Sequence, residues 1–384
     1  MAVNNTEVTM RPQISTSKRI PLLDVARFFG IILVYYGHII ERIMYLENPV
    51  ATAQYKFIYS FHMPFFFLLA GFTIAPEKTL LPLGRYVKRL AASRLVPYFV
   101  FTAVLAVLSL LFAGHFVVVD LTTADGYLKG IVASLLGFPV FNIPLWFMAC
   151  LVSVEILHYA VGRFLDSTLK LAGAAILFYV GGYYLTLKIQ FFPGPNFWLL
   201  HEALVVYAFY LVGVVMRRES ILLGAHSRWR LLLASAVCLL IVVFTYDLNT
   251  GPFRLFQAVV IVLSGHGNVL LFPLTALVGS LLLLLLAKSA GANRFLMFMG
   301  ENALILFCLN GVFYHYFNGP YAEWFAANFP GHWMAVTAAG AAFTAVSLAC
   351  CIPFILLFNR VVPQLVGKPA RQGPLLPRLI SGRL

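Results

Sequence analysis

Apolar runs of about twenty residues recur along the whole of this 384-residue chain. At a rise of 1.5 Å per residue, a helix of that length crosses the roughly 30 Å of hydrocarbon in a bilayer. The composition agrees, because 61% of the residues are hydrophobic and only 11% are charged, against roughly 25% charged in a soluble domain. The alternating ten-residue segments of an outer-membrane barrel are absent. We therefore predict an all-α, polytopic membrane protein.

We predict one transmembrane domain at 21–358, preceded by a polar tail at 1–20 and followed by a second tail at 359–384. Its ten predicted spans are 21–43, 55–75, 95–114, 143–162, 171–188, 200–216, 231–247, 268–287, 295–317 and 333–358. Two shorter apolar stretches, 127–141 and 253–264, are ambiguous, and the second is compatible with a re-entrant, interfacial or half-helical segment. The end of the chain from about residue 360, rich in Pro, Gly and Arg, is typical of a flexible tail.

The basic residues are distributed unevenly between the two sides of this topology. Of the 27 Lys and Arg, 21 fall in the two terminal tails or in loops on the same side of the membrane as the tails. Five fall on the opposite side, and Arg27 lies within a span. By the positive-inside rule both termini are cytoplasmic, and we expect a multi-pass protein of the inner (cytoplasmic) membrane. The net charge of +13 then reflects basic loops against anionic lipid headgroups, and it requires no nucleic-acid partner.

The cysteines point to neither a metal nor a disulfide framework. All five lie within predicted spans, and their spacing is not that of metal ligands. We expect Cys150, Cys238, Cys308, Cys350 and Cys351 to be packing residues.

Ionisable side chains form a stripe on the first predicted span. Arg27 and His38 are eleven residues apart, which places them within about 20° of the same helix face and about 16 Å apart along the axis. Asp24 lies one turn before Arg27 and can pair with it, and Glu41 lies a turn beyond His38. Because ionisable groups within a bilayer cost several kcal/mol, this stripe is a candidate functional site.

His62, in the second predicted span, is expected at about the same membrane depth as His38. Pro64 follows it and frees a backbone carbonyl nearby. A purely structural alternative remains open, in which Asp24 and Arg27 form an interfacial ion pair and each histidine satisfies an interhelical hydrogen bond. Trp146 could pack against a sugar near the outer mouth or anchor the helix at the membrane interface, and we expect the second use.

Several segments resemble integral-membrane acyltransferase family 3, whose members O-acylate polysaccharides and other glycans. The resemblance covers most of the chain and is carried by the following stretches: LDVARFFGIILVYYGH, with the family's Arg/Lys-x10-His signature, YSFHMPFFFLLAGF, KRLAASRLVPY, NIPLWFMACLVSVE and FMGENALILFCLNGVF. The length is similar to that of the short, ten-span members. Among these, the chain most resembles the fucose 4-O-acetylase-like and exopolysaccharide acetyltransferase members.

The chain departs from the family's pattern at two places. Ala91 stands at the first position of an Arg-x-x-Arg pair whose second member is Arg94. Asn310 stands where the late stretch usually ends in histidine, and His315 lies one turn further. Glu155 and Asn302 fit the pattern, with their roles open.

The resemblance implies roles for the ionisable residues of the first two predicted spans. His38 is the implied catalytic histidine, acting as a base or as a transient acyl carrier. Arg27 stabilises charge or orients the donor, Asp24 holds Arg27, and His62 supports His38.

The implied donor is acetyl-CoA or a related acyl-CoA, with no metal. Its phosphates fit the basic loop before the third span, although the positive-inside rule explains the same charges equally well. The residues expected to bind the donor are Arg85, Lys88, Arg89 and Arg94.

The implied acceptor is a polysaccharide or lipid-linked glycan, most simply an exopolysaccharide, with glycan-assembly enzymes as possible partners. The alternative is a proton-coupled transporter or exporter of a small solute, in which Asp24, Arg27, His38 and His62 form a proton relay.

Overall fold

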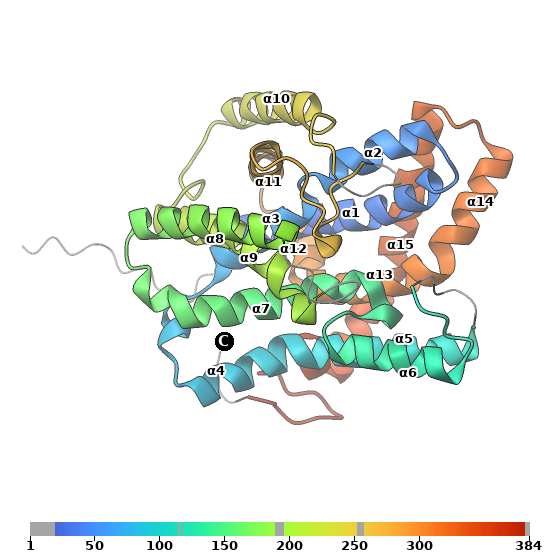
Figure 1. Ribbon diagram of the computed structural model, residues 1–384, viewed down its shortest axis with the longest axis horizontal. Coiled ribbons are helices and arrows are strands. Elements are labelled where there is room, and N and C mark those ends of the chain that lie inside the picture. The colour runs from blue at the N-terminus through green and yellow to red at the C-terminus, as the bar shows by residue number, and fades with distance from the viewer. Residues whose placement is uncertain (1–19, 114–115, 117, 189–195, 252–256, 381–384) are drawn as a thin grey trace, which may run out of the picture.

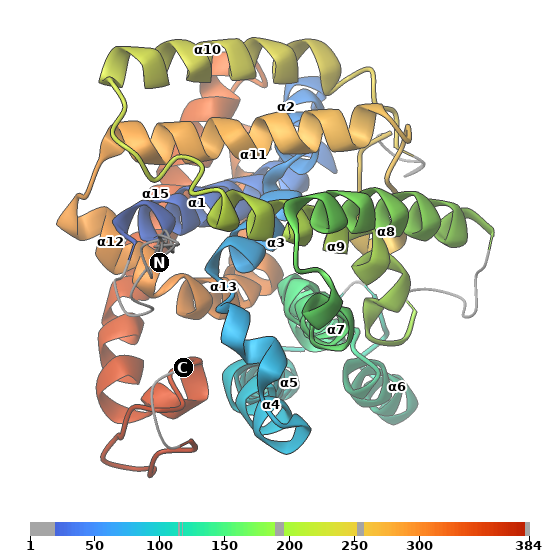
Figure 2. The same cartoon turned by 90° about the vertical axis from the view of Figure 1, so that its left-hand side faces the viewer.

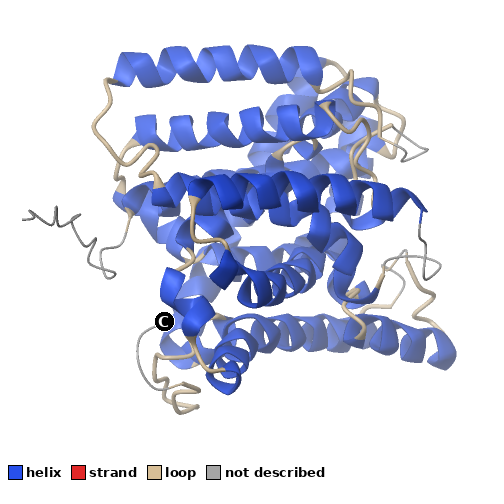
Figure 3. Cartoon of the chain, turned by 60° about the vertical axis from the view of Figure 1, so that its left-hand side comes forward, coloured by secondary structure: helices blue, strands red, loops and turns tan. Residues whose placement is uncertain are grey.

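In a computed structural model, the chain is a bundle of helices (Figure 1). The structure describes residues 20–380 except 114–115, 117, 189–195 and 252–256. Over these residues Figure 3 shows helices and loops without a strand, and the β-pairing is limited to an isolated bridge between Val260 and Gly265. The predicted all-α class is confirmed.

Long apolar helices account for nearly all of the predicted spans. The described residues hold eight helical stretches long and apolar enough to cross a membrane, or nine if a pair of helices bent by 66° within 294–328 counts as one span. The helices are α1 (Pro21–Met44), α2 (Pro49–Tyr59), α3 (His62–Thr73), α4 (Leu83–Leu90), α5 (Val96–Leu111), α6 (Ala124–Leu135), α7 (Trp146–Val161), α8 (Thr168–Lys188), α9 (Leu200–Arg218), α10 (Arg228–Thr245), α11 (Leu271–Ala290), α12 (Arg294–Glu301), α13 (Ala303–Val312), α14 (Asn318–Asn328) and α15 (Trp333–Val361).

The predicted span 55–75 is broken in two. α2 ends at Tyr59 and α3 begins at His62, because the backbone of Phe61 leaves the helical region at φ −145° and ψ −21°. Pro64 falls in the first turn of α3, where a missing N–H disrupts no helical hydrogen bond. The break places His62 at a helix N-terminus inside the bundle.

α1 lies in the middle of the bundle and α10 at its edge (Figure 2). Of the most apolar window in each helix, 67% of α1 is buried, against 22% of α10. α1 packs against α2, α3 and α11 to α15, whereas α10 packs mainly on α11. The ionisable stripe on α1 is therefore held inside protein.

Two π-helical turns interrupt the long helices. They span Ala91–Leu95, between α4 and α5, and Phe313–Phe317, between α13 and α14. Such turns occur frequently at functional sites. These two contain Arg94 and Tyr314, both of which contact the ion pairs described below.

The expectation of a flexible C-terminal tail is wrong for the described residues. α15 continues to Val361, a 3₁₀ turn (η8) follows at Pro363–Val366, and the chain then packs back on the bundle. Gln364 Nε2 donates to the carbonyl of Leu376 at 2.6 Å, and Arg371 lies 3.4 Å from Glu301. Composition alone does not show these contacts, since they depend on where α12 and α15 bring their partners.

Candidate active site

A histidine–carboxylate pair lies near the end of α1. Nδ1 of His38 is 3.1 Å from Oε2 of Glu41, one helical turn further along. The two side chains are only 12% and 9% exposed. A proton on Nδ1 donates to the carboxylate, and this leaves the lone pair on Nε2. In that tautomer, Nε2 is the ring nitrogen that can accept a proton.

Tyrosines supply hydrogen-bond donors to the Glu41 carboxylate. The hydroxyl of Tyr59 donates to Oε2 at 3.1 Å, and the hydroxyls of Tyr45 and Tyr314 lie 3.2 and 3.5 Å from Oε1. The ring of Tyr314 also packs edge-on against His38, with centroids 4.8 Å apart. A buried carboxylate requires such donors, but Tyr314 is 273 residues away in the chain. The position of Glu41 within an apolar span implies that its carboxylate needs hydrogen-bond donors, but the sequence does not identify Tyr314 as one of them.

His62 lies beside this pair. Its Nδ1 donates to the carbonyl of Ile58 at 2.9 Å, and its ring packs edge-on against Tyr59 at 4.7 Å. His38 and His62 line one small cavity of about 40 Å³, which we call the histidine cavity. The structure thus brings together the two imidazoles that were expected at the same depth, while their roles stay a prediction.

The loop before α11 and Trp146 close the histidine cavity. Val259 to Val262 line it, and the described part of the ambiguous segment 253–264 is a loop with one 3₁₀ turn at Ile261–Leu263. Ser264 Oγ donates to Oε1 of buried Glu202 at 2.5 Å and so anchors this loop to α9. Trp146, expected as an interfacial anchor, is 8% exposed and lines the cavity.

A second, larger cavity of about 440 Å³ contains Arg27, Arg94 and Lys368 in its lining, and we call it the cationic cavity. Arg27 Nη1 donates to Oδ1 of Asp24 at 2.9 Å, as the sequence predicted. The pair is held in place by close packing of α12 on α1, since a Cβ added to Gly300 would lie 1.8 Å from the carbonyl oxygen of Asp24.

The predicted donor-binding residues do not form a single site. Arg94, in the π-helical turn, donates from Nε and Nη2 to Oε1 of Glu155 at 3.2 and 2.8 Å and faces the cationic cavity. Arg85, Lys88 and Arg89 line a different pocket of about 420 Å³ with Ile380. Arg85, Lys88 and Arg89 lie on α4, whereas Arg94 lies further along the chain, in the π-helical turn.

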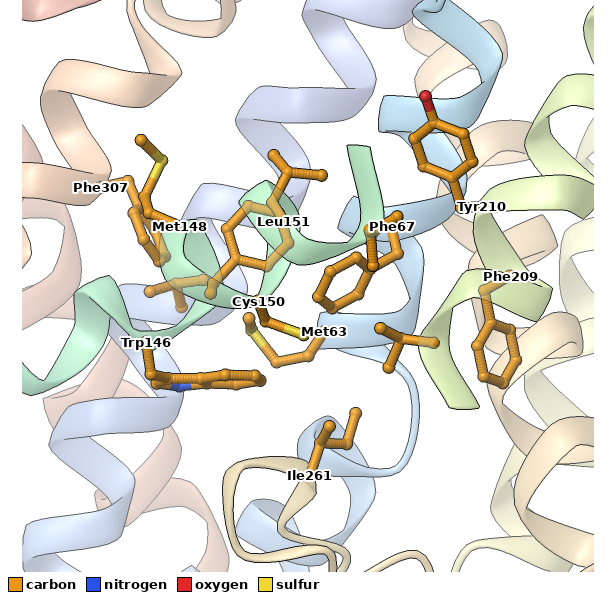
Figure 4. Close-up of a cluster of buried hydrophobic side chains, with 14 of the residues drawn as sticks. Met63, Phe67, Trp146, Met148, Cys150, Leu151, Phe209, Tyr210, Ile261 and Phe307 are labelled. Atoms are coloured by element: carbon orange, nitrogen blue, oxygen red, sulfur yellow. The ribbon is translucent and has the colours of Figure 1, made fainter. Parts of the chain in front are cut away.

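Apolar side chains lie between the histidine cavity and the cationic cavity. In Figure 4, Met63, Trp146 and Ile261, which line the first cavity, lie toward one side of this cluster, and Met148, Leu151 and Phe307 lie toward the other. Phe307 belongs to the lining of both cavities. Phe307 therefore separates the two cavities at the point where their linings meet.

The structure predicts that Glu155→Ala destabilises the protein by on the order of 2 kcal/mol, because Arg94 is left without its carboxylate in a poorly solvated place. That figure is reduced from the value for a fully buried pair, since 27% of the Arg94 side chain is exposed. Thermal unfolding in detergent measures the effect. Asp166→Asn removes an exposed partner of Lys170 and serves as the matched control. Equal melting temperatures for the two variants would contradict the prediction.

Asn310, His315 and Asn302 are buried, whereas Ala91, at the other departure from the family's pattern, is half-buried. The ring of His315 packs at a tilt against Phe116, with centroids 4.2 Å apart, and lies outside the lining of the histidine cavity. Asn302 accepts from Asn359 Nδ2 and from Lys368 Nζ, each at 2.7 Å, and thereby reaches the edge of the cationic cavity. Among the described residues, no group of three or more His, Cys, Asp and Glu is placed to hold a metal ion, and the five cysteines are free.

The fold and these two cavities define a polytopic membrane protein with a buried histidine–carboxylate pair near one end of its first helix. Residues 20–356 match the family described as an acyltransferase domain, and the chain belongs to this family, integral-membrane acyltransferase family 3. It is a multi-pass membrane acyltransferase. No curated protein and no solved structure matches the chain. Family membership favours acyl transfer over the proton-coupled transport that the stripe alone left open.

Proposed function

We propose that this protein transfers an acetyl or similar acyl group from acyl-CoA to a hydroxyl group of a polysaccharide or lipid-linked glycan. The observation that carries the proposal is the orientation of His38. Its Nδ1 faces Glu41, its ring lines the histidine cavity, and its helix also presents Arg27 to the cationic cavity.

The proton steps follow from this orientation. Nε2 of His38 takes the proton from the acceptor hydroxyl as that oxygen attacks the acyl carbonyl carbon. The Glu41 carboxylate stabilises the resulting imidazolium through Nδ1–H, in the way the acidic member of a catalytic triad does. The carbon–sulfur bond then breaks, and His38 returns the proton to the departing thiolate. His62 supports the site by holding Tyr59 against His38 and Glu41.

The residues of the cationic cavity fit the donor. Acyl-CoA supplies an activated acyl thioester and carries phosphates, which guanidinium and ammonium groups bind well. Arg27 and Arg94 would hold those phosphates, each kept in place by its own carboxylate partner. Arg85, Lys88 and Arg89 would attract the donor from the same side, which the charge bias assigns to the cytoplasm.

The acceptor is proposed to reach the histidine cavity from the opposite side. The loop that lines this cavity precedes α11, on the side where the topology places few basic residues. A saccharide acceptor and an exopolysaccharide product agree with the family resemblance. The proposed location is the inner membrane. Glycan-assembly enzymes are proposed as partners.

An assay of the purified protein in lipid vesicles tests the proposal. Acetyl-CoA labelled in the acetyl group is supplied together with surface polysaccharide from the producing cells, and labelled glycan is the expected product. The label should leave the glycan on mild alkaline treatment, as an O-ester does. An active preparation of folded protein that labels no glycan with any acyl-CoA would refute the proposed reaction.

Phe307→Ala is expected to uncouple the two substrates. Removing the ring joins the cationic and histidine cavities, so that water reaches the acyl group before the acceptor does. We expect hydrolysis of acyl-CoA without acceptor to rise about tenfold while transfer to glycan falls. Release of free CoA in the absence of glycan measures this leak. Phe317→Ala, at an exposed ring outside both linings, is the control. An identical leak in both variants would show that the Phe307 ring does not keep the two cavities apart.

A further inference from the structure

Trp146 places a hydrogen-bond donor in the wall of the histidine cavity. Its side chain is 8% exposed and lines this cavity together with His38 and His62. Figure 4 shows its ring on the side of the apolar cluster where Met63 and Ile261, also in the lining, lie. A buried tryptophan usually pairs its indole N–H, yet Nε1 of Trp146 donates to no acceptor among the described residues. Nε1 is also not one of the fully enclosed unpartnered atoms of these residues, so its N–H is open to a ligand in the cavity.

The other polar side chains of this lining already use their donors. His38 Nδ1 faces Glu41, and its Nε2 is the proposed base. The Tyr59 hydroxyl donates to Oε2 of Glu41 at 3.1 Å. His62 Nδ1 donates to a backbone carbonyl at 2.9 Å, so Nε2 of the neutral ring carries a lone pair and only accepts. Among the described side chains that line the histidine cavity, Trp146 therefore supplies the donor that is left for a substrate.

Two helices begin at the wall of the histidine cavity and add positive potential there. α3 starts at His62 and α7 at Trp146, and they are 12 and 16 residues long. The peptide dipoles of a helix sum to roughly half a positive charge at its N-terminus. The rest of the lining is mostly apolar, which strengthens electrostatic interactions inside the cavity. The Glu41 carboxylate pairs with Nδ1 of His38, so the cavity favours negative charge that develops beside the imidazole.

The position of Trp146 is fixed by the packing of the preceding turn on α13. A 3₁₀ turn, η3 (Val140–Leu145), leads directly into α7 at Trp146. Asn142 Nδ2 donates to the carbonyl of Cys308 at 3.2 Å. A Cβ added to Gly311 would lie 2.1 Å from Oδ1 of Asn142, so glycine allows this close contact. The indole donor is therefore held in place before a substrate binds, as electrostatic stabilisation of a transition state requires.

We propose that Trp146 is a catalytic residue whose Nε1–H stabilises the oxyanion of the tetrahedral intermediate. This inference rests on the proposed acyl-transfer function. As the acceptor oxygen bonds to the acyl carbonyl carbon, the carbonyl π electrons move onto the carbonyl oxygen, and His38 holds the acceptor's proton. Nε1–H donates a hydrogen bond to that oxyanion and keeps its own proton. The C=O bond then re-forms, the carbon–sulfur bond breaks, and the thiolate takes the proton from His38. Arg27, the other candidate for stabilising charge, lines the cationic cavity instead.

Steady-state acyl transfer by the full-length protein in lipid vesicles tests the inference. Trp146→Phe removes the N–H and keeps an aromatic ring, so kcat is expected to fall about 10²-fold, the lower end of the effect of losing one oxyanion donor. KM for acyl-CoA and the affinity for CoA should stay unchanged, because the donor acts only on the intermediate. Trp229→Phe, at an indole that is 80% exposed, is the matched control and should keep the parental kcat.

A second substitution covers the case in which Trp146→Phe fails to fold. Benzothienylalanine, introduced at position 146 by codon suppression, keeps the shape of the indole and has sulfur in place of the N–H. It should lower kcat by a similar factor while the melting temperature is kept. A parental kcat in folded protein with either substitution would overturn the inference and leave the proposed function standing. A parent protein that transfers no acyl group would refute the proposed function, and the inference with it.

Discussion

Replacing His38 with glutamine is expected to lower acyl transfer by about 10²–10⁴-fold, the range for the loss of a general base. The amide cannot accept the acceptor's proton at the position of Nε2, whereas the cationic cavity lies at the other end of α1 and is left intact. We therefore expect kcat to fall by this factor while the affinity for CoA stays unchanged. Acetyl transfer to glycan in vesicles, measured together with CoA binding, separates these two quantities.

Two other histidines serve as comparisons for His38. His226→Gln changes an exposed ring and should leave transfer unchanged. His62→Gln should lower transfer by only about tenfold, because His62 acts through Tyr59 and does not itself take the proton. Transfer that survives His38→Gln at the parental rate would exclude His38 as the base and return the stripe on α1 to a structural role.

Replacing Glu41 with glutamine is expected to lower kcat by about 10²-fold or more, with KM for acyl-CoA unchanged. The amide can present its NH₂ group to His38 Nδ1, and the imidazole then carries its proton on Nε2 and can no longer act as a base there. The nearly isosteric side chain still offers an oxygen to the tyrosine hydroxyls that surround Glu41. The decrease in kcat therefore measures the effect of Glu41 on the orientation and charge of His38, with little contribution from unfolding.

Conservative rescue distinguishes this positioning role from a structural one. Glu41→Asp keeps the charge and should recover part of kcat, whereas Glu41→Ala should lower both kcat and the melting temperature, since it leaves buried tyrosine hydroxyls without an acceptor. Parallel losses of kcat and stability across all three variants would show that Glu41 serves only the fold.

The membrane class and the helix positions could be predicted from local properties of the chain. Hydrocarbon offers no partners to backbone N–H and C=O groups, so long apolar segments must form helices, and their positions can be recognised without knowledge of packing. The pairing of Asp24 with Arg27 and the proximity of Glu41 to His38 are likewise local, because residues three apart in a helix share a face.

Local reasoning was less successful where the chain stops being regular. The hydropathy of the predicted spans does not indicate the break at Phe61 or the two π-helical turns. Those irregular points carry His62, Arg94 and Tyr314. The stripe itself borders two separate cavities, and Phe307 belongs to the lining of both.

The sequence by itself determined that this chain is a helical membrane protein, that it resembles the acyltransferase family to which it belongs, and that ionisable residues lie on one face of its first span. These properties depend on hydropathy, short motifs and the helical period, all of which act over a few residues. Only the tertiary structure determined which distant groups complete the sites. Tyr314 reaches Glu41, Glu155 pairs with Arg94, and Lys368 enters the cationic cavity, because helix packing brings together residues far apart in the chain.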